Sequence, residues 1–185
     1  MRKRINIFDA LLDFTEILIL ATTVFAVVYV FIGQLLEVYG GSMIPNFIDG
    51  ERLIAEKVSI KYKPLTRGEV VVFQDPNSTI RRLLIKRVVG LPGEAIKLSN
   101  GLVYINGEKL DEPYLDSNVP TNVLKNGLIK ENEEYPIAQN TYILLGDNRE
   151  QSTDSRYFGS VKKDSIIGRV FLIYYPINKI RLVEN

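Results

Sequence analysis

Ser42 is the first residue in this chain that suggests chemistry, because it follows two glycines in the segment VYGGSMIPNF, residues 38–47. The chain contains neither histidine nor cysteine. A Ser-His-Asp triad, thiol catalysis, disulfides and thiolate metal sites are therefore excluded. If Ser42 is a nucleophile, its proton must pass to a carboxylate, a tyrosinate or a neutral lysine. The alternative is that the glycines only form a flexible exit from the preceding apolar segment.

A candidate base is Lys86 in the segment LLIKRVVG, residues 83–90. In a strand, Lys86 shares a face with Leu84 and Val88, so it must reach solvent, pair with a carboxylate or lose its proton. To be neutral near neutral pH, its pKa must fall by about 3 units, at a cost of roughly 4 kcal/mol. Apolar burial produces shifts of that size. Spacing alone leaves both a solvent-reaching lysine and a catalytic base open.

The segments that must position these two residues are short and rich in β-forming residues. Asn106-Gly107 within LVYINGEKL predicts a type I′ hairpin turn. No repeat and no helical periodicity appear after the N-terminal region. The sequence predicts a mainly β domain, with the polar residues 111–140 as an insertion or long loop. The predicted strands are residues 52–58, 69–74, 80–90, 141–146 and 166–175.

The N-terminal region predicts a membrane anchor, because residues 17–36 carry no charged side chain. At about 1.5 Å per residue, a helix of this length spans roughly 30 Å, the thickness of a bilayer core. Arg2, Lys3 and Arg4 precede the segment, and the first basic residue after it is Arg52. This asymmetry predicts a single-pass protein of the plasma membrane, with residues 1–16 cytoplasmic, residues 17–36 transmembrane and residues 37–185 extracytoplasmic.

A cleaved signal peptide is the alternative, with small-residue spacing at Val38-Tyr39-Gly40. The apolar run exceeds the usual signal-peptide core of about 7 to 15 residues, which favours the anchor.

The amino-acid composition narrows the remaining classes of protein. The chain has 185 residues, a net charge of +1, 46% hydrophobic and 24% charged residues. This balance favours a folded core over disorder and gives no signal for nucleic acid. Phosphate-loop and dinucleotide patterns are absent, and without histidine or cysteine a metal would need oxygen ligands alone. We therefore expect no cofactor, no metal and no nucleic-acid partner.

Four segments resemble, in order, the conserved boxes of type I signal peptidases. They are GGSMIPNF with Ser42, RGEVVVFQDP from Arg67, IKRVVGLPGE from Ile85 and GDNREQSTDSRYFG from Gly146. The single preceding apolar span is similar to the one-span bacterial form of that family. The resemblance ends near Val161 and leaves residues 111–140 unmatched. It implies a signal-peptidase β domain, acting as a membrane-bound serine endopeptidase that removes signal peptides from exported preproteins.

The resemblance implies roles for individual residues. Ser42 is the expected nucleophile and oxyanion donor through its backbone N–H, Lys86 the general base, and Ser152 the hydroxyl that orients the lysine. We expect the charged residues of the last box to support the site structurally: Asp147, Arg149, Asp154 and Arg156.

The sequence departs from the family pattern at two positions. Some members carry a hydroxyl residue as a second oxyanion donor where this chain has Gly40. Asn46 replaces a common threonine, and either side chain could hydrogen-bond a local turn. We expect Gly40 and Gly41 to let the backbone turn and approach the substrate closely.

Substrate recognition is also an expectation from the resemblance. The family binds its substrate as an added strand and accepts small side chains, typically alanine, at the first and third positions before the cut. Met43 and Ile85 are candidate linings of shallow apolar pockets, with core packing as the alternative. Expected partners are signal peptides, the lipid bilayer and the translocation machinery.

Two other functions compete. Self-cleaving repressors of the DNA-damage response use related Ser/Lys chemistry, but they need a soluble DNA-binding region where this chain has an apolar segment. A catalytically idle, membrane-anchored β domain that binds exported proteins would not need both Ser42 and Lys86.

Overall fold

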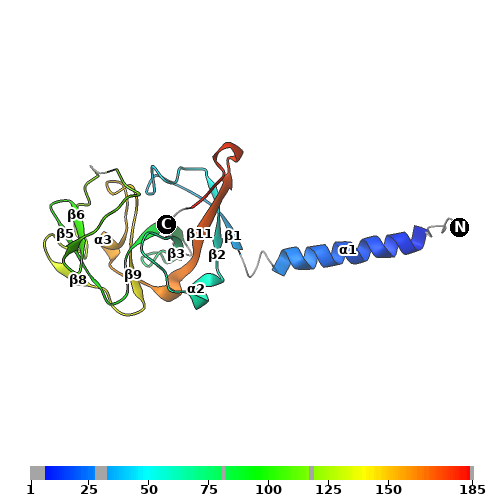
Figure 1. The fold of residues 1–185 in the computed structure, drawn as a ribbon, viewed down its shortest axis with the longest axis horizontal. Helices are drawn as coiled ribbons and strands as arrows, with labels where there is room; N and C mark the ends of the chain where they lie inside the picture. The colour runs from blue at the N-terminus through cyan, green and yellow to red at the C-terminus, as the bar shows by residue number, and fades with distance from the viewer. Residues whose placement is uncertain (1–6, 28–32, 81, 117–118, 184–185) are drawn as a thin grey trace.

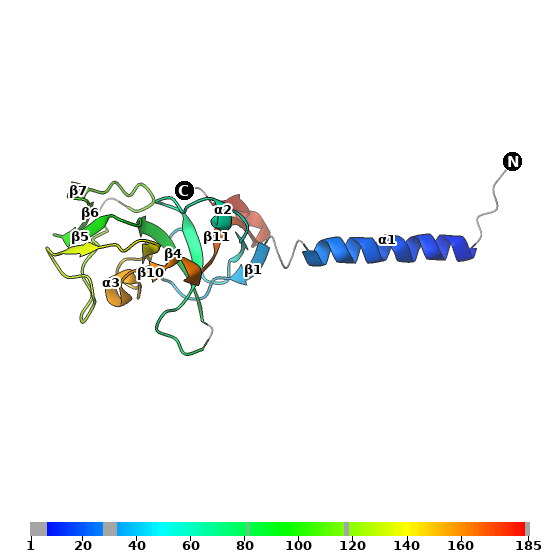
Figure 2. The same ribbon diagram turned by 90° about the horizontal axis from the view of Figure 1, so that it is seen from below.

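The computed structural model describes residues 7–27, 33–80, 82–116 and 119–183. A long helix, α1 (Ile7–Val27), extends away from two β-sheets that make up the rest of the fold (Figures 1 and 2). Among the described residues, no helix has both the length and the apolar character that a membrane crossing requires. Residues 28–32 of the predicted span lie outside the described residues.

The end of the predicted span is wrong. Gly33–Leu36 do not continue a helix but belong to strand β1 (Gly33–Glu37), which pairs antiparallel with β2 (Arg52–Glu56). In this register Leu35 lies opposite Ile54. The absence of charge in residues 33–36 suits a membrane helix and a strand equally, and cross-strand pairing decides between them. The β domain therefore includes residues 33–36, which the prediction placed in the membrane span.

The larger sheet carries the proposed site. All its neighbouring strands pair antiparallel, and β1 lies at one edge. Strand β12 (Arg181–Leu182) pairs with β11 outside this path. The order across the sheet is β1, β2, β11 (Ile166–Tyr175), β3 (Val70–Gln74), β4 (Leu83–Gly90), β9 (Thr141–Leu145) and β10 (Val161–Lys162).

A smaller sheet lies at the opposite end of the domain from α1 (Figure 1). Its order is β7 (Glu108–Lys109), β6 (Leu102–Ile105), β5 (Ala95–Ser99) and β8 (Glu134–Pro136). Asn106 and Gly107 have φ values of 50° and 85°, and Ile105 pairs with Glu108 around them. The predicted type I′ hairpin turn is confirmed, because this turn requires positive φ at both central residues.

The short helices are α2 (Ser59–Tyr62), α3 (Ser155–Phe158) and the 3₁₀ turns η2 (Lys163–Ser165) and η3 (Ile177–Lys179). The mainly β prediction is confirmed, and each predicted strand corresponds to an observed one, most of them shorter at an end. The prediction of a strand from residue 80 is too long: β4 begins at Leu83, because residues 75–80 form the loop between β3 and β4.

Strand β4 packs against apolar clusters on both faces of the sheet, because its residues point alternately to the two faces. Ile85 packs against the cluster that contains Met43 and Phe47. Val88 belongs to a second cluster with Phe73 and Leu144, and Val89 to a third, beside the smaller sheet. Packing on both sides fixes this strand, and with it the backbone of Lys86.

The prediction that residues 111–140 form an insertion or long loop outside the core is wrong in part. Ile129 and Ile137 are 0% and 3% exposed and belong to the core of the smaller sheet. Residues 134–136 form β8. The few apolar residues of this segment are too widely spaced to show a strand or helix period, so their burial becomes visible only when the sheet is assembled.

Candidate active site

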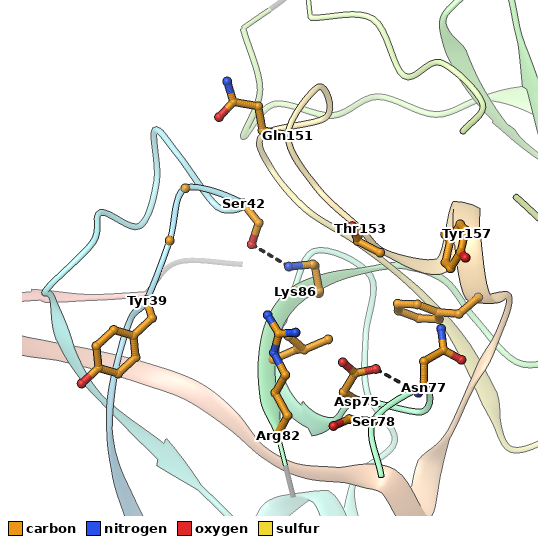
Figure 3. A pocket seen from close by; sticks show the side chains of 14 residues that line it. Tyr39, Ser42, Asp75, Asn77, Ser78, Arg82, Lys86, Gln151, Thr153 and Tyr157 are labelled. Atoms are coloured by element: carbon orange, nitrogen blue, oxygen red, sulfur yellow. Dashed lines mark hydrogen bonds between the residues drawn. The ribbon is translucent and has the colours of Figure 1, made fainter. Parts of the chain in front are cut away.

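Ser42 and Lys86, 44 residues apart in sequence, are in direct contact. The Lys86 Nζ lies 2.6 Å from the Ser42 Oγ, and it also donates to the Ile85 carbonyl oxygen at 3.0 Å (Figure 3). Lys86 is 2% exposed, so its amine is withdrawn from bulk solvent. The side chain neither reaches solvent nor forms an ion pair within the described residues.

The environment of Lys86 favours its neutral form. Desolvation by burial is the largest cause that lowers the pKa of Lys86, from its ordinary 10.5 to about 8. The nearby carboxylates Asp154 and Asp147 oppose this shift, while the guanidinium groups of Arg82 and Arg156 add to it. A lysine with this pKa is partly neutral at mildly alkaline pH and can accept a proton from a hydroxyl.

The loop that carries Ser42 is held in place by hydrogen bonds to its backbone groups. Asn148 donates its backbone N–H to the Ser42 carbonyl at 3.1 Å and its side-chain amide to the Gly41 carbonyl at 3.0 Å. Gly40 has φ +83°, a backbone conformation that favours glycine, and its N–H donates to Asp49 Oδ1 at 2.6 Å. The sequence pattern did not predict this role of Asn148, although the residue lies within the GDNR motif.

Ser152 lies next to Ser42 but does not contact Lys86 through a hydrogen bond. An added Cβ at Gly146 would clash with the Ser152 side chain and with the Ser42 carbonyl, so both serines approach the same glycine. Ser152 is 4% exposed, and its hydroxyl has no hydrogen-bond partner among the described residues. The structure therefore brings this residue to the site without the expected bond to the lysine.

Asp154 and Arg156 form a buried ion pair, with Arg156 Nε and Nη2 each 2.9 Å from an oxygen of Asp154. Asp154 also accepts the Gly146 N–H at 3.0 Å and caps helix α3. Arg156 Nη2 donates to the Ser152 carbonyl at 3.2 Å. The pair thus ties together the two ends of the loop that contacts Ser42.

Asp147 pairs with Arg87, a residue for which the sequence pattern predicted no role. Arg87 Nε and Nη2 donate to the two oxygens of Asp147 at 2.8 and 2.6 Å, and both side chains are buried. Asn46 also donates to Asp147, at 2.9 Å, and to the Tyr114 carbonyl at 2.8 Å. The Asn46 side chain therefore joins segments far apart in the chain rather than a local turn, because its partners are 68 and 101 residues away. The signal for Arg87 was a second charged residue in an otherwise apolar strand.

Arg149 reaches into the segment 111–140. Its guanidinium forms a bidentate ion pair with Glu112, hydrogen-bonds Thr121 and donates through Nε to the Gly146 carbonyl at 3.1 Å. Although burial lowers the pKa of Arg149, the hydrogen bond and charge of Glu112 leave it raised above its ordinary value. Neither Glu112 nor Thr121 was predicted, because no local sequence signal links them to a residue about thirty positions away.

Two cavities meet at Ser42 and Lys86. The larger, of about 530 Å³, has a mainly polar lining that includes Arg82, Asp75, Asn77 and Thr153 (Figure 3). The smaller, of about 90 Å³, is mainly apolar and is lined by residues that include Leu36, Val38, Leu53, Val72, Leu83 and Ile85.

Met43 lines neither cavity. It is 1% exposed and packs in the core with Phe47 and Val72, so its assignment to a substrate pocket is corrected to core packing. Ile85 does border the smaller cavity. In the described part of the chain, no three acidic side chains converge as metal ligands would.

A β domain in which a buried lysine contacts a serine has the arrangement of a serine peptidase that uses no histidine. The family model "Signal peptidase, peptidase S26" matches residues 11–175. The chain therefore belongs to the signal peptidase family. It is a type I signal peptidase, which removes signal peptides by serine peptidase chemistry.

The sequences of individual relatives support this family assignment. The chain is 33% identical over 160 residues to a probable signal peptidase I-2 of Synechocystis sp., covering 84% of this chain and 69% of that protein. It is 35% identical over 168 residues to signal peptidase I U of Bacillus subtilis, covering 90% and 88%. It is 33% identical over 187 residues to signal peptidase IB of Staphylococcus aureus, covering 95% of both.

A crystal structure of a signal peptidase I from Enterococcus faecalis is 35% identical, with a TM-score of 0.47, and the match covers 58% of this chain and 97% of that one. The sequence relatives favour the signal peptidase interpretation over the self-cleaving repressor and the idle β domain.

Proposed function

We propose that Ser42 is the nucleophile and Lys86 the general base of signal-peptide cleavage. The observation that carries this proposal is the 2.6 Å contact between Lys86 Nζ and Ser42 Oγ inside a buried environment. Neutral Lys86 accepts the hydroxyl proton as Oγ attacks the scissile carbonyl carbon. The resulting lysinium gives this proton to the leaving amine when the peptide bond breaks. Water then gives a proton to Lys86 and attacks the acyl carbon. The lysinium returns this proton to Ser42 Oγ as the ester bond breaks, which frees the product acid and regenerates both residues.

The Ser42 backbone N–H is the proposed oxyanion donor. It has no hydrogen-bond acceptor among the described residues. Gly40 offers no side-chain donor, and its backbone N–H already donates to Asp49 Oδ1. A preorganised donor at this place would stabilise the charge that develops on the carbonyl oxygen of the substrate.

Ser152 is the proposed partner that orients the Lys86 amine during the reaction. Its buried hydroxyl has no other partner among the described residues, so a bond to the amine would satisfy it. Asp147, Arg149, Asp154 and Arg156 are the proposed supports of the surrounding loop. Their ion pairs with Arg87, with Glu112 and with each other cross-link it to the sheet and to residues 111–140.

The substrate binds, in this proposal, as an extended strand beside the beginning of β4. Side chains at the first and third positions before the cut enter the small apolar cavity bordered by Ile85. A volume of about 90 Å³ suits small residues such as alanine.

We also propose that the apolar segment beginning at residue 17 anchors the enzyme in the plasma membrane, and that residues 1–16 are cytoplasmic. The β domain would face outward, near the bilayer and the translocation machinery. The support is the basic cluster Arg2 to Arg4, because cytoplasmic flanks carry an excess of such residues. Resistance to alkaline carbonate extraction, together with protease access to the β domain from outside the cell, would support this topology. A soluble chain beginning near Gly41 would contradict it.

The catalytic assignment is tested by purified Ser42→Ala, Lys86→Arg and Lys86→Met proteins assayed on a preprotein. Arginine keeps the positive charge but does not lose its proton at working pH, so Lys86→Arg is expected to be inactive, as are the other two variants. Wild-type activity should rise with pH through the Lys86 pKa of about 8, since the deprotonated amine is the competent form. Near-normal cleavage by Lys86→Arg, free of host peptidase, would overturn the dyad.

A further inference from the structure

The first residues of β4 present different chemistry to the two cavities. Arg82, just before the strand, lines only the large polar cavity, whereas Leu83 and Ile85 line only the small apolar one. Leu84 and Lys86 border both. This division follows the alternation of a strand, in which residues two apart share a face.

The same part of β4 has an edge that no strand of the described chain covers. Strand β3 pairs with β4 from Leu83 to Arg87, but on the other side β9 pairs only with Arg87, Val88 and Gly90. Because this edge is uncovered, an extended peptide can add to β4 between Leu83 and Lys86, as peptides do at exposed sheet edges. Tyr39, which is 79% exposed, borders both cavities.

The position of the small cavity sets the direction of this peptide. The cut lies at Ser42 and Lys86, and the apolar cavity that takes the side chains before the cut extends along β4 toward Leu83. The substrate therefore runs parallel to β4. Because its side chains alternate, odd-numbered positions before the cut enter the apolar cavity and even-numbered positions face the large one. Ile85 and Leu83, which line the apolar cavity, then lie beside the first and third positions, and Arg82, three residues before Ile85, lies beside the fourth.

Arg82 is suited to bind an anion there. Its side chain is exposed and forms no ion pair within the described part of the chain, and Figure 3 shows it extending toward Lys86. Asp75 lines the same cavity, but its Oδ1 accepts the Asn77 N–H at 2.9 Å and closes the loop between β3 and β4. A guanidinium offers several donors to a carboxylate in a fixed geometry.

We propose that Arg82 is a specificity-determining residue that binds an acidic side chain of the signal peptide at the fourth position before the cut. This rests on the proposed cut site at Ser42. The pair forms in a cavity that is open to solvent, so its effect is moderate: about two- to fivefold in kcat/KM. Raising the salt concentration to about 1 M should reduce it, because exposed charge pairs are screened.

The test uses the full chain in detergent and peptides that share an alanine cleavage sequence. They differ only in carrying glutamate, glutamine or lysine at the fourth position before the cut or, as a second series, at the second position after it. The measured quantity is the kcat/KM ratio of the glutamate to the lysine peptide. We expect a ratio above one in the first series, near one for Arg82→Gln and below one for Arg82→Glu. Arg82→Lys should retain part of the preference.

Matched variants separate this effect from others. Lys130→Gln removes an exposed lysine that lines neither cavity at Ser42 and should leave the ratio unchanged. Asp75→Asn removes a negative charge from the cavity and should raise the ratio. A uniform change in the cleavage of all peptides cancels in the ratio, so an altered Lys86 pKa in the Arg82 variants does not imitate the result.

An unchanged ratio in Arg82→Gln, or a glutamate preference that appears only in the series after the cut, would overturn the proposal. Loss of cleavage in Ser42→Ala is required for the proposed nucleophile and does not depend on Arg82. If Ser42→Ala still cleaved these peptides, the catalytic assignment would fail and the cut could no longer be placed opposite Arg82. The two failures are therefore distinguishable.

Discussion

Asn148 holds the backbone of Ser42 in place. Its N–H donates to the Ser42 carbonyl, and its side-chain amide donates to the carbonyl of the preceding residue, Gly41. The two carbonyls are thereby turned toward the loop after β9. Because the peptide groups on either side of Ser42 are fixed, the direction of the Ser42 side chain and N–H is set before substrate arrives.

Asn148→Ala should lower kcat about fivefold with little change in KM. The substitution removes the side-chain bond to Gly41 and the longer bond, at 3.3 Å, that the Gln151 N–H donates to Asn148 Oδ1. It leaves the backbone bond to Ser42 intact, and one neutral hydrogen bond is worth about 1 kcal/mol. Asn148→Asp should be slower still, because a carboxylate oxygen would replace the amide group that donates to the Gly41 carbonyl oxygen. Steady-state kinetics on one peptide give both constants. An Asn148→Ala enzyme with wild-type kcat would show that the loop holds Ser42 without this side chain.

Lys86→Met should make the protein more stable near neutral pH while abolishing activity. The native pKa of about 8 lies below the ordinary 10.5, so between these values the unfolded wild-type chain binds more protons than the native one. Wild-type stability is therefore highest above the ordinary pKa and falls as pH drops toward 8. The full difference is about 3 kcal/mol at 1.36 kcal/mol per pKa unit.

The measurement for Lys86→Met is urea unfolding of both full-length proteins in detergent across this pH range. Methionine has similar length and no charge, so its stability should lack this pH dependence. Equal pH dependence in the two proteins would mean that Lys86 is not desolvated in the folded state.

Gly40→Ser should reduce activity rather than supply a second, side-chain oxyanion donor. Gly40 has φ +83°, where a side chain costs on the order of 1–3 kcal/mol, although no heavy atom lies within 4 Å of an added Cβ. The strain falls on the loop that positions Ser42. Gly50→Ser, at φ +82° and also with open space around it, is the matched control for the cost of strain alone. A rise in kcat for Gly40→Ser with a stability loss equal to that control would refute this expectation.

Asp147→Asn should destabilise the fold by about 3 kcal/mol or more, because it leaves the buried Arg87 guanidinium without its counter-charge. Glu37→Gln is the contrasting variant: it breaks an ion pair with Arg52 whose side chains are 35% and 50% exposed, and should cost less than about 1 kcal/mol. Urea unfolding of both variants provides the comparison. Similar small losses would mean that water reaches the Arg87–Asp147 pair.

Ser42 and Lys86 could be identified from the sequence because each lies in a short motif that can be read without knowledge of the fold. Few kinds of catalysis fit a serine that follows two glycines together with a lysine in an apolar strand. The absence of histidine excluded the Ser-His-Asp triad as well. The partners of the support residues were not predictable in the same way. Arg87 with Asp147, and Arg149 with Glu112, join residues separated by 60 and 37 positions, and no periodicity encodes such pairs.

The same contrast explains the errors in the fold. Leu35 and Leu36 extend an uncharged run, and only pairing with β2 shows that they form a strand. Met43 stands beside Ser42 in sequence, but adjacent residues of a turn point in different directions, and its side chain enters the core.

By itself, the sequence determined the β-rich composition, the hairpin at Asn106-Gly107 and the chemical types at Ser42 and Lys86, because these depend on local conformational preference and residue identity. Tertiary structure alone decided the 2.6 Å contact between them, the burial that lowers the pKa of Lys86 and the place of Arg82 in the cavity. Desolvation and charge interaction depend on distance in space, and that distance exists only after strands far apart in sequence have packed together.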